Sequence, residues 1–187
     1  MAKFQTWNNA KLCELIIYIA EHSKDDTSFG AVKLNKLLYY SDFSAYRQLR
    51  NSITDAEYQH IHEGPAPRHL LPARKQLLKE DAIEIKQVPY YSGVQQRIIP
   101  KRTFKRDLFT DEELKIVDEV IHDLKPLNGS EVTERSHREL GWRLTQESET
   151  IHYRTAWLSS EPLTEEQVSH GKKVAERHGF RRKLGTA

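Results

Sequence analysis

Histidine is the residue type in this chain with the most obvious capacity for chemistry, and there are nine of them. His60 and His62 are two positions apart, Glu63 follows directly, and His69 lies downstream. Imidazole and carboxylate groups bind zinc, so this set could hold a metal ion. In an extended segment, however, side chains two positions apart point to opposite sides, and the spacing matches no established metal motif. We therefore predict histidines divided between surface and core, without a metal site.

A second set of histidines and carboxylates lies in the C-terminal half. His137 and His152, together with Glu134 and Glu139, could act as general acid and base. The sequence has no glycine-rich phosphate loop, no paired-histidine zinc motif and no activated serine. We expect His137 to cap or pack at a helix end. The chain is predicted to have no catalytic residues and no cofactor, and not to be an enzyme.

Large amphipathic side chains form a third group, and such residues are common both in cores and at interfaces. Tyr39 and Tyr40 are neighbours in a helical pattern, so they point about 100° apart and at most one faces the core fully. The other is expected at a rim or an interface. Further candidates for core or interface positions are Tyr90 and Tyr91, Trp142 and Trp157.

Residues Lys101 to Arg106 form a basic stretch with Phe104 between the cations. Such a segment can contact nucleic-acid phosphates. Asp107 and Asp111 follow closely, together with two glutamates, so the local charge nearly cancels. We predict a solvated surface whose charges pair with one another, and we do not expect nucleic acid as a partner.

Composition excludes several classes of protein. The chain has 187 residues, 29 Lys and Arg, 27 Asp and Glu, and a formal net charge of +2, which argues against a dedicated nucleic-acid binder. The longest apolar stretch, Leu12 to Ala20, contains Glu14 and is shorter than the roughly 18–20 residues of a membrane span. The N-terminus has no apolar signal region. A single cysteine, Cys13, excludes an internal disulfide framework and is predicted to be a small core residue. We expect a cytoplasmic protein without a membrane partner.

Hydrophobic periodicity predicts the elements that must position these residues. The expected fold class is mainly α (α+β): a compact helical domain with one small β-hairpin or small antiparallel sheet. Thr110–Glu113 and Thr164–Gln167 are predicted capping boxes. Helices are expected at about 9–22, 30–50, 65–79, 111–125, 131–140 and 165–177, and a hairpin from 82–88 and 94–99.

Four landmarks occur in an order that resembles one protein family. Lys33–Tyr40 resembles the K-L-x-K-L-L-Y-Y signature of Panacea-domain proteins, also called SocA-like antitoxins. Three further elements match in order and distance over about residues 10 to 160. They are Ala56–His60 followed by Gly64-Pro65, Ser136-His137 followed by Trp142, and Ile151–Tyr153.

The chain departs from the family pattern in two places. The family commonly has Gly-Pro-Val where this chain has Gly64-Pro65-Ala66-Pro67. The hairpin around Tyr90 and the helix after Pro162 have no match, and we expect these variable regions to determine partner choice. The resemblance implies domain boundaries at 1–160 for a Panacea-like domain and 161–187 for a C-terminal helix and basic tail, packed on or extending the same domain.

The resemblance implies an antitoxin of a bacterial or prophage toxin–antitoxin system that neutralises a cognate protein toxin, encoded by the adjacent gene, by direct binding. The alternative is a proteolytic adaptor that delivers the toxin to an AAA+ protease, with the basic tail from Phe180 to Ala187 as a second contact. A nucleic-acid-binding regulator and a metal-dependent enzyme remain as further alternatives. The expected toxin-binding residues are Tyr39, Tyr40, Tyr58, His60, Tyr90, Tyr91 and Trp142.

Overall fold

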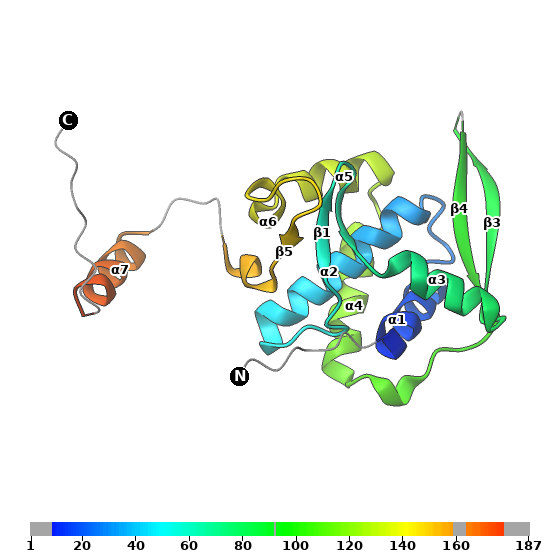
Figure 1. Ribbon diagram of the computed structural model, residues 1–187, viewed down its shortest axis with the longest axis horizontal. Coiled ribbons are helices and arrows are strands. Elements are labelled where there is room, and N and C mark those ends of the chain that lie inside the picture. The colour runs from blue at the N-terminus through cyan, green and yellow to red at the C-terminus, as the bar shows by residue number, and fades with distance from the viewer. Residues whose placement is uncertain (1–8, 92, 159–163, 178–187) are drawn as a thin grey trace.

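The computed structural model describes residues 9–91, 93–158 and 164–177, and its fold is mainly helical with two small antiparallel sheets (Figure 1). The fold class predicted from the sequence is therefore confirmed. The helices are α1 (Asn9–His22), α2 (Ala31–Leu49), α3 (Leu70–Lys79), α4 (Asp111–Leu124), α5 (Gly129–His137), α6 (Leu140–Arg143) and α7 (Glu165–Arg177), with short 3₁₀ turns η1 (Arg106–Leu108) and η2 (Tyr153–Trp157). The strands are β1 (Tyr58–Ile61), β2 (Gly64–Pro67), β3 (Ile83–Tyr90), β4 (Gly93–Pro100) and β5 (Thr150–Ile151).

Helix α1 is central, as its nearly continuous apolar surface predicts. Every residue from Leu12 to Ala20 is buried, including Glu14. The Glu14 carboxylate accepts hydrogen bonds from both terminal nitrogens of Arg102, at 2.8 and 2.6 Å, and from the Lys105 N–H at 2.9 Å. Burial raises the pKa of Glu14, but these hydrogen bonds outweigh it and hold the pKa below its usual value. A buried charge with a two-pronged partner thus attaches the segment before α4 to the core.

Three of the four cations in the basic stretch before α4 form ion pairs. Arg102 pairs with Glu14, Lys101 pairs with Asp81, and Arg106 pairs with Asp111. The prediction of a self-paired surface is confirmed for Arg106. Arg102 differs, because its partner comes from the core helix rather than from the neighbouring acidic residues.

The three-stranded sheet corrects the predicted helix start at Pro65. Residues Gly64–Pro67 form β2, which pairs antiparallel with β1, and the strand order is β2–β1–β5. A residue before proline is pushed toward the extended region, and Ala66 is in this position before Pro67. Proline has no N–H to donate to a neighbouring strand. An edge strand such as β2 tolerates it, because the N–H groups on its outer side have no strand to bond to. Helix α3 instead begins at Leu70 and accommodates Pro72 in its first turn.

The hairpin of β3 and β4 confirms the prediction from alternating residues 82–99. Its middle is fastened to the turn between α1 and α2 by Arg97, which donates to the carbonyl oxygens of Asp26 at 2.8 Å, Ser23 at 3.2 Å and Lys24. Gln95 adds a hydrogen bond to the Thr27 carbonyl at 2.8 Å. The far end of the hairpin projects beyond the helices (Figure 1).

Helices α4 and α5 begin at capping boxes. Thr110 Oγ1 accepts from the Glu113 N–H, as predicted, and Asn128 does the same for Ser130 and Glu131. The helix expected at 131–140 is two helices, because α5 ends at His137 and α6 begins at Leu140. This break turns Trp142 back toward the sheet, as its hydrogen bond to the Ile61 carbonyl shows.

Helix α7 confirms the last predicted helix, with Thr164 and Gln167 exchanging the hydrogen bonds of a capping box. It lies apart from the other elements in Figure 1, and none of its residues is buried. The basic tail from Phe180 to Ala187 is outside the described residues, and the domain boundaries remain a prediction. Among the described residues, no helix has the length and apolar character needed to cross a membrane.

Candidate functional site

The two lysines of the opening signature are buried structural residues on α2. Lys33 Nζ lies 2.5 Å from Asp26 Oδ2 and donates to the carbonyl oxygens of Lys125 and Leu127, at 3.1 and 2.6 Å. Lys36 is 0% exposed; its Nζ donates to the Pro65 carbonyl at 3.3 Å and, at short range, to that of Glu63. Each lysine therefore pins a loop to α2, which positions the β1–β2 turn and the start of α5.

Burial lowers the pKa of Lys36 from the ordinary 10.5 to about 8. Between pH 8 and 10.5 the unfolded chain therefore binds more protons at this lysine than the folded chain, so stability rises with pH. Burial raises the pKa of Cys13 from 9.0 to about 11, which opposes the gain above pH 9.

We therefore expect the free energy of unfolding to rise by about 1 kcal/mol between pH 8 and 9 because of Lys36. Urea unfolding at both pH values measures the change in the wild type and in Lys36→Met. The methionine variant lacks the titrating group and is expected to lose this increment. An equal rise in both proteins would assign it to another group.

Two of the predicted contact residues, Tyr39 and Tyr58, lie in the core and are 2% and 1% exposed. Their rings meet edge to face at 5.6 Å, and Phe43 packs against both. The Tyr58 hydroxyl donates to Asp42 at 2.7 Å. Both tyrosines hold the domain together, so neither offers a surface that a partner can touch in this conformation.

Tyr40, the neighbour of Tyr39, is half-buried instead, and the Arg135 guanidinium lies 5.3 Å from its ring centre. This agrees with the expectation that only one of the two neighbours faces the core fully.

His60 and Trp142 belong to a stack of three rings that joins the sheet to α5. The indole of Trp142 lies between two imidazoles, with ring centres 4.3 Å from His60 and 4.0 Å from His137. Trp142 Nε1 donates to the Ile61 carbonyl at 3.2 Å, and His137 Nε2 lies 3.1 Å from the His62 carbonyl oxygen. The predicted role of His137 as a packing residue at a helix end is confirmed.

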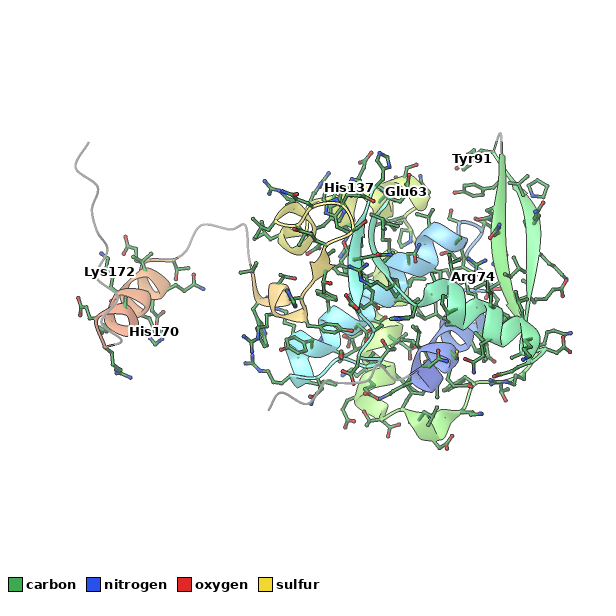
Figure 2. The ribbon with its side chains drawn as sticks, in the orientation of Figure 1. Glu63, Arg74, Tyr91, His137, His170 and Lys172 are labelled. Atoms are coloured by element: carbon green, nitrogen blue, oxygen red, sulfur yellow. The ribbon has the colours of Figure 1, made fainter. Side chains whose placement is uncertain are left out.

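A surface cleft of about 460 Å³ lies beside this stack. Its walls come from the tip of the β3–β4 hairpin, the β1–β2 turn, the start of α2 and one face of α5 along its whole length. Figure 2 shows Glu63 and His137 close together and Tyr91 at the hairpin tip on the same side of the molecule. We refer to this site as the hairpin cleft; the lining residues used below are Glu63, Tyr90, Tyr91, Glu134 and His137.

The two tyrosines of the hairpin cleft are held differently. The Tyr90 hydroxyl lies 3.0 Å from Ser28 Oγ, which fixes its ring. Tyr91 is 89% exposed and has a φ of 48°, a left-handed conformation that costs energy for a residue with a Cβ. Their rings meet at 4.7 Å, nearly perpendicular. The hairpin thus presents one fixed and one accessible aromatic ring.

The cleft offers two carboxylates, two tyrosine rings and one imidazole as groups that can contact a ligand or a partner. Burial lowers the pKa of His137 below its ordinary value, and the nearby Lys36 charge acts in the same direction. The His137 ring stacks on Trp142, and its Nε2 forms a hydrogen bond with the His62 carbonyl oxygen. In the described part of the chain, no group of three or more His, Cys, Asp or Glu side chains is arranged to hold a metal ion.

Comparison with known proteins identifies the family. The model of the family "Antitoxin SocA-like, Panacea domain" matches residues 34–143, which is 110 of the 187 residues, and the chain belongs to this family. No curated protein and no solved structure matches the chain. The matched range runs from within α2 to the end of α6, which is shorter than the span of 10 to 160 inferred from the landmarks. It contains the lining residues Glu63, Tyr90, Tyr91, Glu134 and His137.

Sequence reasoning missed Glu63 and Glu134 as members of the cleft and did not foresee the buried roles of Lys33, Lys36 and Asp42. The sequence did contain one signal for these three buried residues, which is a charged side chain on the apolar face of a predicted helix. Lys33 and Lys36 flank Leu34 and Leu37 within the inward stripe of α2. No comparable local signal existed for the cleft, because its walls come from segments far apart in sequence.

Proposed function

We propose that this protein is an antitoxin that binds a cognate protein toxin directly and neutralises it. Membership of the SocA-like antitoxin family carries this proposal. The exposed aromatic tip of the hairpin and the cleft beside it support it, because binding surfaces are enriched in tyrosine and tryptophan. The toxin is proposed to be the product of the adjacent gene, in a bacterial or prophage operon, and to act in the same cytoplasm.

The hairpin cleft, with Tyr90, Tyr91 and the His60–Trp142–His137 stack behind it, is the proposed toxin-binding surface. Tyr40 is proposed to act at its rim. Tyr39 and Tyr58 support this surface from the core.

Growth rescue tests the antitoxin proposal. The chain is co-expressed in a bacterial host with the adjacent gene product, and viability is compared with each gene alone. Rescue of a toxic neighbour, together with a one-to-one complex in a pull-down, is the expected result. A neighbour that is harmless alone, or toxic regardless of this chain, contradicts the proposal.

Removing the exposed ring in Tyr91→Ala is expected to raise the Kd for the toxin about 30-fold, the size of a central hot spot of about 2 kcal/mol. The substitution removes no packing from the core, because Tyr91 is exposed at the hairpin tip. We therefore expect the fold to be retained. Isothermal titration calorimetry measures the change. The matched control is Leu71→Ala, a 64% exposed side chain on α3 outside the cleft, which is expected to leave Kd within twofold. Equal effects of the two substitutions would place the interface elsewhere.

A second candidate function is a proteolytic adaptor, and the position of α7 favours it. This helix has no buried residue and is joined to the domain through residues 159–163. A chain ending at Leu158 is expected to bind the toxin with unchanged affinity but to lose any protease-dependent shortening of the toxin's half-life. Toxin half-life after a translation block measures this. An unchanged half-life in cells with the truncated chain would leave neutralisation by binding as the mechanism.

A further inference from the structure

The hairpin cleft carries an excess of negative charge. Glu63 and Glu134 both line it, and neither lysine nor arginine is among its lining residues. Glu134 has no ion-pair partner in the described part of the chain, whereas Glu63 Oε1 lies 3.2 Å from the exposed His62 Nδ1. The imidazole in the wall, His137, has its pKa lowered by burial, which disfavours its cationic form. The two carboxylates outnumber the buried Lys36 ammonium, which lies behind the β1–β2 turn and donates to the Glu63 carbonyl oxygen.

The start of α5 forms another wall and could in principle attract an anion instead. Its capping box reduces that capacity. The N–H groups of Ser130 and Glu131 donate to Asn128 Oδ1, at 2.9 and 3.1 Å, and the Asn128 N–H donates to Glu131 Oε2 at 2.7 Å. The N–H groups of Ser130 and Glu131 are thus satisfied within the capping box, and the Glu131 carboxylate offsets the positive end of the helix dipole. This wall therefore attracts an anion less than an uncapped helix start would, and the Glu63 and Glu134 carboxylates decide the preference.

Aromatic surface completes the lining. The accessible side chain of Tyr91 lines the cleft together with residues of α5, and Tyr90 is anchored beside it through Ser28. The face of a tyrosine ring attracts a cation through its negative electrostatic potential, and a planar guanidinium also stacks on it. Carboxylates provide the complementary hydrogen-bond acceptors for the same group. A cleft with both features suits a cationic side chain better than an anionic or a purely apolar one.

We propose that the hairpin cleft receives an arginine or lysine side chain presented by the bound toxin, with the cation against the Tyr91 ring and near the carboxylates of Glu63 and Glu134. This inference rests on the proposed antitoxin function and adds the chemistry of the partner. Arginine fits better than lysine, because its planar group can stack and pair with carboxylates at once. The toxin is thus recognised through a basic residue on its surface.

Charge removal without a change of shape tests the inference. The double variant Glu63→Gln/Glu134→Gln is compared with Glu119→Gln, an exposed residue of α4 outside the cleft. Toxin affinity is measured by titration calorimetry at low and high salt. The double variant is expected to raise Kd at least tenfold at low salt and to weaken the dependence of Kd on salt. Glu119→Gln is expected to stay within twofold of the wild type.

A second measurement does not need the toxin. N-acetyl-arginine methylamide is titrated into ¹⁵N-labelled protein, with N-acetyl-glutamine methylamide as the uncharged counterpart. The arginine compound is expected to shift the amide signals of Tyr91, Gly129 and Ser130 in a saturable way, in the wild type only. The glutamine compound is expected to leave them unchanged.

The two measurements separate this inference from the proposed function. If the wild type rescues growth and binds the toxin, but the double variant binds equally well and arginine shifts no cleft signal, the cation site is overturned and the antitoxin proposal stands. If arginine binds in the cleft but the wild type neither rescues growth nor binds the neighbouring gene product, the cation chemistry stands. In that case the proposal that the toxin supplies the cationic side chain is overturned.

Discussion

Replacing Asp42 by alanine is expected to lower the free energy of unfolding by about 4 kcal/mol, because it leaves several buried donors without an acceptor. Asp42 is completely buried on α2. Its Oδ1 accepts the N–H groups of Ile53 and Thr54, both at 2.8 Å. Its Oδ2 accepts the hydroxyls of Thr54 at 2.5 Å and Tyr58 at 2.7 Å. This single carboxylate ties the segment after α2, and the start of β1, to the helix.

Urea unfolding followed by circular dichroism measures the loss. Against a total stability of about 5–15 kcal/mol for a typical domain, a change of this size is a large fraction. Asp42→Asn is expected to cost far less, because its amide keeps one oxygen for the two N–H groups and can donate to hydroxyls that reverse their roles. Asp25→Ala, at an exposed aspartate, is the matched control and is expected to change stability by less than about 0.5 kcal/mol. A loss below 1 kcal/mol in Asp42→Ala would contradict the network's role.

The second large effect is expected for Gly64→Ala, at about 3 kcal/mol of lost stability, from backbone strain and collision together. Gly64 follows the β1–β2 turn with a φ of +92°, which side-chain-bearing residues rarely adopt. A Cβ built there would lie 2.8 Å from Lys36 Nζ and would collide with Ser136 Oγ. Both neighbours are buried, so neither can move away easily. The substitution therefore disturbs the lysine that holds the turn.

Thermal unfolding compares this variant with Gly129→Ala. Gly129 is the first residue of α5, and a Cβ there would meet no atom within 4 Å. Alanine is expected to leave stability unchanged or to raise it by up to about 1 kcal/mol, because glycine is the weaker helix former. If the two variants have the same melting temperature, the turn tolerates a Cβ at position 64. The close packing around Lys36 is then not the reason for glycine at that position.

Local patterns were sufficient to predict most of the helices and the long hairpin. Helix α1 was predicted over its full range, because its apolar residues repeat at helical spacing. Helix α4 was predicted from its capping box, and the hairpin from strict alternation on both sides of a turn. Each of these signals is contained within about twenty residues of sequence, which is why no knowledge of the rest of the chain was needed.

Predictions failed where a distant segment decided the conformation. Residues 64–67 form a strand because β1 lies beside them, and nothing in their own periodicity indicates that partner. The break between α5 and α6 is similar, since Trp142 turns back toward the sheet to pack between His60 and His137. Tyr58 and Tyr91 are both tyrosines in polar surroundings in the sequence, yet one is buried on Asp42 and the other is exposed at a hairpin tip.

The amino-acid sequence by itself determined the fold class, the main helices, the hairpin and, through four ordered landmarks, membership of the SocA-like antitoxin family. Those features depend on local periodicity, on caps and on motifs that can be recognised along the chain. Only the tertiary structure decided which aromatic side chains are accessible, that Lys33, Lys36 and Asp42 are buried fasteners, and that Glu63, Tyr91 and Glu134 line one cleft. The physical reason is distance along the chain. Burial and charge at a site depend on the packing of segments that are separate in the sequence, such as Lys33 and Leu127, which are 94 residues apart and which only the folded chain brings together.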